Sequence, residues 1–258
     1  MKADEDHGSS LLTKKPFIEA TSIETNRDET LRALRQLCGK VTYSVQPETQ
    51  PRLSCGISAL DELLPHKGLE RGSLIEWLTP TDGSGAAILA LQGVRAALES
   101  HRVWAVIDLT GDFHPPAAYG WGVSLESLLL LRPTSVADAV WTVEQCLRCP
   151  AVGVTWCRMP HLPDRVVQRW KRAAEVGGGI GALFRPLLSV RHSSWADVRW
   201  RVEQRTSADM TTRTLHVELV SCRGSFTGGS VDLELHDATG DVCLVSTMAS
   251  ATTVERAT

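Results

Sequence analysis

The sequence has no long hydrophobic run and no disulfide framework. None of its apolar stretches approaches the ~20 residues needed to span a bilayer, and its start carries Asp4, Glu5 and Asp6 in place of the apolar segment of a signal peptide. Its seven cysteines are an odd number without the regular spacing typical of small secreted proteins. These absences predict a cytoplasmic protein with reduced cysteines and no membrane contact.

The chain also lacks a strong net charge. Its formal net charge is −3, which is not typical of a nucleic-acid-binding domain. The charge is unevenly distributed, because residues 151–205 contain ten Lys or Arg against four Asp or Glu. This local excess favours an anionic partner, although basic side chains more often form a solvated surface.

The chain divides into three predicted parts. Residues 1–25 are polar and without periodicity, which is typical of a disordered leader. Residues 26–50 contain leucines at helical spacing, so we predict an N-terminal helix over Arg27–Cys38 and then a linker that contains proline. Residues 51–258 contain the predicted core and a C-terminal β extension. Within this core, Ser58 is expected to cap a short helix.

From Ser73 to Pro186, short apolar runs alternate with helical patterns. This alternation predicts an α/β fold with a mostly parallel sheet flanked by helices on both faces. Ser135 is expected to cap one of the helices. The predicted helices cover residues 86–100, 136–147 and 164–176, and the predicted strands cover residues 74–78, 103–108, 128–131, 152–157 and 180–184. After Pro186 the strand patterns have no helices between them and predict antiparallel strands over residues 198–202, 214–220, 231–235 and 242–246.

The turn that follows the first of these strands has the arrangement of a phosphate-binding loop, in which a strand, a glycine turn and a helix aim backbone N–H groups at a phosphate. In the pattern G-x-x-x-x-G-K-[ST], the lysine reaches the terminal phosphates and the next hydroxyl binds magnesium. When Gly85 is aligned with the second glycine, Pro80, Ala86 and Ala87 take the other three positions. These residues lack the required groups, and the Asp82 carboxylate would repel phosphate. The predicted degenerate loop is Pro80, Thr81, Asp82, Gly83, Ser84, Gly85, Ala86 and Ala87, with an ordinary glycine-rich turn as the alternative.

Two segments before this loop resemble the entry to the ATPase core of RecA-type recombinases. They are Leu53-Ser-Cys-Gly-Ile-Ser-Ala-Leu-Asp-Glu-Leu-Leu-Pro65 and Gly68-Leu-Glu-Arg-Gly-Ser-Leu-Ile-Glu76. More closely, the chain resembles ImuA proteins, which are RecA-like accessory proteins of bacterial mutagenesis cassettes, in Leu183-Phe-Arg-Pro186, Trp195-Ala-Asp-Val-Arg-Trp-Arg201 and Cys222-Arg-Gly224. The resemblance covers about residues 27–236 and implies a RecA-like P-loop core.

The resemblance also implies which parts of an ATP site are missing. RecA-type enzymes place a catalytic glutamate two residues after the aspartate that ends a strand, where it activates water, and this chain has Thr110 there. They place a magnesium-supporting aspartate at the end of the next core strand, where this chain has Cys157, whose thiol is a poor ligand for magnesium. We therefore expect no catalytic residue, no ATP, magnesium or other cofactor, and no bound metal.

The function that this resemblance implies is a non-catalytic accessory or scaffold protein in SOS-linked translesion DNA synthesis and induced mutagenesis. The implied partners are RecA, ImuB and the error-prone polymerase of the same cassette, with weak contact to single-stranded DNA. Two alternatives remain open. One is a divergent RecA-like ATPase that binds nucleotide through the backbone of Thr81–Gly85, and the other is a SulA-like cell-division inhibitor, which would bind the GTPase FtsZ.

Tryptophans lie among arginines in the basic part of the chain. Trp170, Trp195 and Trp200 show this pattern, which suits a protein interface or stacking on unpaired bases. The alternative is that the rings pack under the sheet while the arginines face water. The candidate contact residues are Arg165, Arg169, Trp170, Arg172, Arg185, Trp195, Arg199, Trp200, Arg201 and Arg223.

Two further groups of residues could suggest a metal site or catalysis, but we favour structural roles for both. Cys146-Leu-Arg-Cys149 has the spacing of a zinc ligand pair, with Cys157 and His161 downstream. Because one pair ends a predicted helix and the third cysteine ends a predicted strand, we favour core packing over a tetrahedral site. Asp112 and His114 are interpreted as a turn-capping aspartate and a surface histidine.

Overall fold

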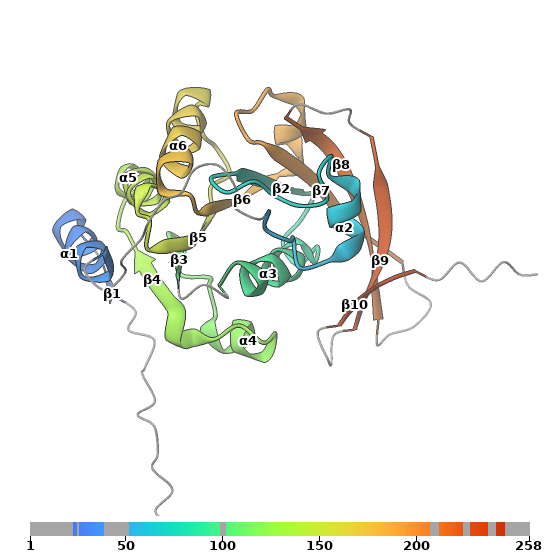
Figure 1. Cartoon of the computed structure of the whole chain (residues 1–258), viewed down its shortest axis with the longest axis horizontal. Helices are drawn as coiled ribbons and strands as arrows, with labels where there is room; N and C mark the ends of the chain where they lie inside the picture. The colour runs from blue at the N-terminus through green and yellow to red at the C-terminus, as the bar shows by residue number, and fades with distance from the viewer. Residues whose placement is uncertain are drawn as a thin grey trace, which may run out of the picture.

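The computed structural model describes residues 23–24, 26–38, 52–98, 102–206, 212–223, 228–236 and 241–245, so the predicted leader, apart from two residues, and the predicted linker lie outside the described part. The described strands form one sheet (Figure 1). They are β1 (Ile23–Glu24), β2 (Leu74–Thr79), β3 (Val103–Ile107), β4 (Leu128–Arg132), β5 (Val152–Arg158), β6 (Ile180–Pro186), β7 (Val198–Arg205), β8 (Thr212–Cys222), β9 (Ser230–His236) and β10 (Val242–Leu244).

The strand order is β1-β4-β3-β5-β6-β2-β7-β8-β9-β10. Neighbouring strands are parallel from β1 to β7 and antiparallel from β7 to β10. This confirms the predicted α/β fold with antiparallel strands at the C-terminal end. In one respect the prediction is wrong, because β7 also pairs in parallel with β2, from Ile75 opposite Val198 to Leu78 opposite Arg201. The change of direction therefore falls after β7.

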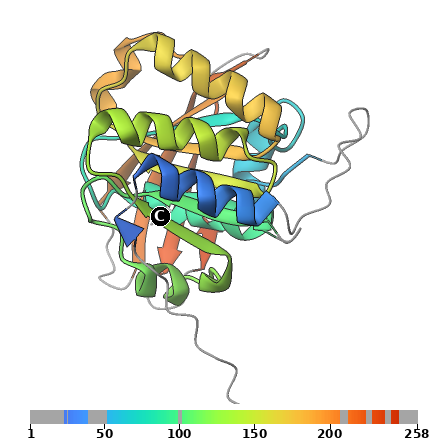
Figure 2. The ribbon, with the colours of Figure 1, turned by 90° about the vertical axis from the view of Figure 1, so that its left-hand side faces the viewer.

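Helices cover both faces of the sheet (Figure 2). The helices are α1 (Arg27–Cys38), α2 (Ser58–Leu63), α3 (Ala86–Ala97), α4 (Pro115–Gly120), α5 (Val136–Arg148) and α6 (Asp164–Gly177), with 3-10 turns η2 (Leu125–Ser127) and η3 (Leu187–Arg191). One hydrophobic cluster joins α1, α5 and α6 to the sheet, and the other joins α2 and α3 to the opposite face and to the antiparallel strands. Within the described residues, no helix is both long enough and apolar enough to cross a bilayer.

The N-terminal helix α1 is part of this packed body. Asn26 accepts a hydrogen bond from the backbone N–H of Glu29 (3.0 Å), and the Glu29 carboxylate accepts one from the backbone of Asn26 (3.2 Å). This reciprocal pair forms a capping box at the start of the helix. Leu34 is buried in the cluster with α5, so α1 covers the sheet and does not stand apart from the core.

Two cap predictions have opposite outcomes. The Ser135 hydroxyl accepts a hydrogen bond from the Asp138 backbone N–H (3.1 Å), which confirms the predicted cap of α5. The prediction for Ser58 is wrong, because Ser58 is already the first helical residue and the residue before it makes no side-chain cap bond. Instead, the carboxylate of Asp61, within α2, accepts a hydrogen bond from the backbone N–H of Cys55, which precedes the helix (2.7 Å).

The sequence pattern also missed α4. No helix is predicted over residues 115–120, but Pro115 begins a short helix there. Proline is suited to the first helical position because the N–H that it lacks has no helical partner there. Most bounds differ slightly from the predicted ones; for example, α3 ends at Ala97, earlier than predicted, and β6 continues to Pro186.

Candidate functional site

The loop between β2 and α3 lies at the carboxyl end of the parallel strands. Gly83 and Gly85 both have left-handed φ angles, of 80° and 87°. A Cβ atom at Gly85 would also lie 2.6 Å from Cδ1 of Leu215 on β8, so the position needs glycine for conformation and for space. Gly85 precedes α3 and provides no side-chain cap. The local geometry is therefore a tight glycine turn that leads into a helix, as predicted.

Three loop residues occupy the positions of the first glycine, the lysine and the hydroxyl residue of a phosphate-binding loop. Ala86 is buried at the start of α3 and belongs to the hydrophobic cluster of that face. Ala87 is half-buried, and Pro80 is exposed at the end of β2. None of these side chains carries a charge or a hydroxyl, so at these positions the loop presents only backbone groups to a ligand.

Two arginines from distant parts of the chain reach this loop. Arg158, the last residue of β5, forms a salt bridge with Asp82. Arg213 of β8 donates a hydrogen bond to the Gly83 carbonyl oxygen (3.3 Å). Asp82 is 83% exposed and Arg158 is 45% exposed, so solvent weakens their pair to about 0–1 kcal/mol. The negative charge of Asp82 in the loop therefore lies beside the positive charges of Arg158 and Arg213. The sequence did not predict that these two arginines reach the loop.

Cys157 does not face this loop. Its side chain is buried with α5 and α6, on the sheet face opposite α3, and burial raises the pKa of its thiol. Side chains alternate between the two faces of a strand, so the next residue, Arg158, reaches the loop instead. The alternation of the strand residues Trp156, Cys157 and Arg158 was the signal that could have identified it.

Thr110 is exposed in the segment that follows β3. The aspartate two residues earlier, Asp108, is buried and holds this segment in place. Its carboxylate accepts hydrogen bonds from the backbone N–H groups of Asp112 (3.0 Å) and Phe113 (3.3 Å) and from Nε of Arg132 (3.1 Å). Asp108 therefore has a structural role, and the position aligned with a catalytic base carries only a hydroxyl.

The predicted contact residues separate into two groups. For the first group the prediction of a surface role is wrong, because the side chains are buried; these are Trp170, Arg185, Arg199 and Trp200. The second group is exposed or half-buried and remains available to a partner; these are Arg165, Arg169, Arg172, Trp195, Arg201 and Arg223.

The two buried tryptophans have core roles on opposite faces of the sheet. Trp170 is 0% exposed, and its Nε1 donates a hydrogen bond to the Val140 carbonyl oxygen (3.1 Å), which links α6 to α5. Trp200 stacks on Trp77, with ring centroids 6.4 Å apart. Large aromatic rings contribute much of the area buried in a core, which is why the packing alternative holds for these two residues.

The two buried arginines bind one buried carboxylate. Glu76 of β2 is 0% exposed and accepts hydrogen bonds from Nη1 of Arg185 (2.9 Å) and Nε of Arg199 (2.8 Å). Ser194 donates a third bond to it (2.7 Å). Arg199 also donates to the Ser189 carbonyl oxygen (2.6 Å). This network ties β2, β6 and β7 to the segment after β6.

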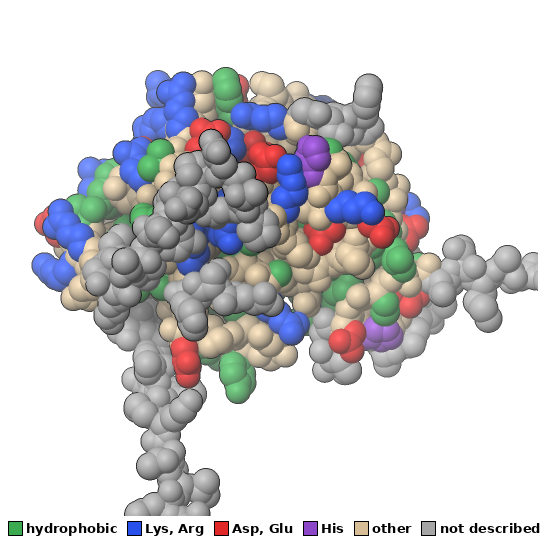
Figure 3. All heavy atoms as spheres, in the orientation of Figure 1, with side chains coloured by type: hydrophobic (Ala, Val, Ile, Leu, Met, Phe, Trp, Pro, Cys, Tyr) green, Lys and Arg blue, Asp and Glu red, His purple; other side chains and the backbone are tan. Residues whose placement is uncertain are grey.

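Arginines gather on the outer surface of α1, α5 and α6 (Figure 3). Among the described residues, neither Arg165 nor Arg172 forms a salt bridge, whereas Arg148 and Arg169 share the Glu144 carboxylate. The exposed acids of the same three helices are Asp28, Asp164 and Glu175. We call this surface the basic helical face and define it by Arg32, Arg35, Arg148, Arg165, Arg169 and Arg172.

Sequence reasoning identified only the part of this face that lies on α6. Arg32 and Arg35 of α1 belong to a helix placed outside the predicted core, and Arg148 precedes the basic part of the chain. The cysteines of the possible zinc motif, in contrast, are buried, as core packing predicts. They are Cys146, Cys149 and Cys157. Burial raises the pKa of the Cys146 thiol, which disfavours the thiolate that a metal requires.

No protein-family model matches the chain. It is similar to the protein RecA of several bacteria: 37% identical over 102 residues to that of Rhodopirellula baltica, 35% over 106 residues to that of Chlorobium chlorochromatii, and 33% over 141 residues to that of Parvibaculum lavamentivorans. These matches cover 40%, 41% and 55% of this chain but only 27%, 30% and 37% of the relatives. The similarity is therefore to about a third of RecA.

Proposed function

We propose that the chain is a non-catalytic RecA-like accessory protein of the ImuA kind, which acts in SOS-linked translesion synthesis by docking on RecA. The observation that carries this proposal is the loop after β2, where Pro80, Ala86 and Ala87 take the positions of the groups that bind phosphate and magnesium. Thr110 and Cys157 lack the chemistry of a base and of a magnesium-supporting acid. On this proposal the fold serves for recognition and consumes no ATP.

The basic helical face is the proposed contact surface. It extends over α1, α5 and α6, which pack one against the next, and its Arg165 and Arg172 are exposed and form no salt bridge among the described residues. Arginine is suited to both carboxylates and phosphates because its guanidinium donates several hydrogen bonds in one plane. A RecA filament on single-stranded DNA offers both. ImuB and the error-prone polymerase are the further partners that we propose from the resemblance to ImuA proteins.

We expect the protein not to bind ATP. Calorimetric titration of the protein with ATP and magnesium at millimolar concentration is expected to give no saturable binding, with or without single-stranded DNA. The reason is that the loop supplies no lysine and no magnesium-binding hydroxyl. RecA titrated under the same conditions is the positive control.

Saturable, magnesium-dependent binding would contradict this part of the proposal and favour the divergent ATPase. Arg158 supports that second candidate, because its guanidinium lies beside the loop. The Arg158→Ala variant then distinguishes two cases. Loss of binding in this variant identifies Arg158 as a substitute for the missing lysine, whereas unchanged binding places the nucleotide elsewhere.

The second prediction concerns docking. The double variant Arg165→Glu/Arg172→Glu is expected to weaken binding to a RecA filament on single-stranded DNA by about tenfold or more, since each reversal removes one favourable surface contact of up to ~1 kcal/mol and adds a repulsive one. Surface plasmon resonance measures the affinity. The matched control is Arg52→Glu/Arg95→Glu, which makes the same charge change away from the basic helical face.

Equal affinity of the two double variants would exclude the basic helical face as the docking surface. The same measurement on single-stranded DNA without RecA separates the two sources of attraction. We expect weak binding to the DNA alone, with a steep dependence on salt concentration.

A further inference from the structure

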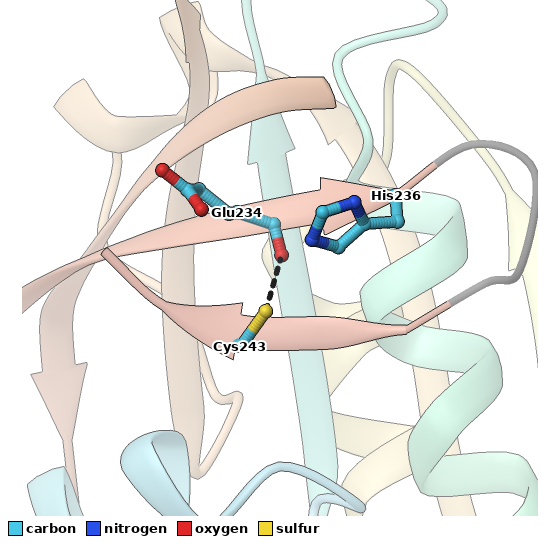
Figure 4. A group of neighbouring side chains, drawn as sticks. All are labelled: Glu234, His236 and Cys243. Atoms are coloured by element: carbon cyan, nitrogen blue, oxygen red, sulfur yellow. Dashed lines mark hydrogen bonds between the residues drawn. The ribbon is translucent and has the colours of Figure 1, made fainter. Parts of the chain in front are cut away.

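Three metal-binding side chains converge on the edge of the antiparallel strands. Glu234 and His236 belong to β9, and Cys243 belongs to β10. One ligand atom from each lies within 4.8 Å of the others. Figure 4 shows the three side chains next to one another on the two strands.

The strand register explains why they meet. Residues two apart on a strand project to the same face, so Glu234 and His236 are neighbours. Cys243 is the direct partner of Glu234 across the antiparallel pair, and directly opposite side chains also share a face. Leu235, which lies between the two β9 ligands, and its cross-strand partner Val242 pack against the hydrophobic core on the other face. The cluster is thus a consequence of the register and faces outward.

The neighbouring groups leave this cluster available. Asp232, the next residue on the same face of β9, already binds Arg205 (3.0 Å) and His216 (2.6 Å). Among the described residues, the Cys243 thiol makes one long contact, of 3.9 Å, with the Glu234 carbonyl oxygen. The exposed position of Cys243 gives an ion access from solvent.

We propose that Glu234, His236 and Cys243 form a zinc site with three protein ligands and an open fourth position. Zinc binds thiolate, imidazole and carboxylate ligands, commonly in tetrahedral geometry with bonds of about 2.0–2.3 Å, which places ligand atoms roughly 3.3–3.8 Å apart. The three atoms lie within 4.8 Å of one another, so side-chain rotation has to bring them closer to reach that spacing. A carboxylate with a thiolate does not suit magnesium or calcium, which prefer oxygen ligands alone.

Metal binding would stabilise the pairing of β9 and β10 at this edge of the sheet. β10 has three residues and pairs only with β9 among the described strands, so an ion held by both strands would fasten this edge of the sheet. Ligands that bind only the folded state stabilise it by mass action. The site also has an open fourth position that water or a partner side chain can fill. This inference does not depend on the proposed function.

The test uses the full chain, titrated with Zn²⁺ by calorimetry and with Co²⁺ by absorption spectroscopy. We expect one high-affinity Zn²⁺ and a thiolate-to-cobalt charge-transfer band. His236→Ala and Cys243→Ser are each expected to weaken Zn²⁺ binding by at least about 10- to 100-fold, the range known for loss of a group that merely supports a ligand. The charge-transfer band is expected to disappear in Cys243→Ser.

Matched controls are Cys222→Ser and His66→Ala, which remove a cysteine and a histidine outside the cluster. Both are expected to bind like the unchanged protein. The proposal is overturned if the unchanged protein binds no stoichiometric Zn²⁺, or if His236→Ala and Cys243→Ser bind it as well as the controls do. Circular dichroism of each variant shows that a lost signal does not reflect unfolding, and Glu234→Gln provides a nearly isosteric third variant.

Discussion

Replacing Glu76 with alanine is expected to lower the free energy of unfolding by about 3–5 kcal/mol, because removing one partner of a buried charged pair leaves the others buried without compensation. Glu76 is 0% exposed and binds both Arg185 and Arg199. The two guanidiniums are also nearly buried, so they cannot recover hydration without moving the strands. Urea unfolding followed by circular dichroism measures the change.

The matched control is Glu203→Ala, which removes an acid from the outer face of β7. Glu203 binds Arg201 at 2.6 Å, but both side chains are more than 30% exposed, so the expected loss is below about 1 kcal/mol. Equal losses in the two variants would show that the Glu76 network does not hold the sheet together. Glu76→Gln separates charge from shape, and we expect it to remain substantially destabilised because two positive charges stay buried.

Glu76 is the last residue of the segment that resembles the entry to the ATPase core of RecA-type recombinases. Its contacts here are with arginines of β6 and β7, not with the loop after β2. In this chain the glutamate therefore has a structural reason to be present that does not involve a nucleotide.

The Trp170→Ala variant is expected to lose about 3–5 kcal/mol of stability, the range for large aromatic residues truncated in a core. The ring is 0% exposed between α5 and α6, and its N–H is hydrogen-bonded to Val140. Trp195→Ala is the matched control, since this tryptophan is 42% exposed and its loss should cost less than about 1 kcal/mol. Denaturant unfolding of both variants gives the comparison.

A Trp170→Ala protein of nearly unchanged stability would contradict the core assignment and revive the interface prediction. Trp170→Phe refines the result, because it retains an aromatic ring but removes the hydrogen bond to Val140. We expect this variant to lie between the unchanged protein and Trp170→Ala. Filament binding by Trp195→Ala then tests whether the exposed tryptophan contributes to docking.

Local patterns in the sequence were sufficient for the order of the strands from β2 to β10 and of the helices other than α4. Apolar runs alternating with helical periodicity placed every strand from β2 to β10, and the Ser135 cap followed from short-range chemistry. The sequence pattern did not predict α4, and it placed Ser58 before α2 as a cap when Ser58 is the first residue of that helix. In both places, several backbone conformations suit the same few residues. The absence of a lysine after Gly85 was also visible in the sequence alone, because it concerns residue type and not position in space.

Tertiary structure decided which side chains meet and which face they occupy. Arg158 reaches Asp82 across 76 residues, and Arg199 reaches Glu76 across 123 residues. Burial of Trp170 depends on the packing of α6 against α5. Pairing across the sheet brings residues together through strand register and helix docking, which depend on contacts between segments distant in sequence. The sequence by itself determined most of the elements and the residue types of the loop after β2, whereas only long-range packing determined the buried ion network, the basic helical face and the Glu234–His236–Cys243 cluster.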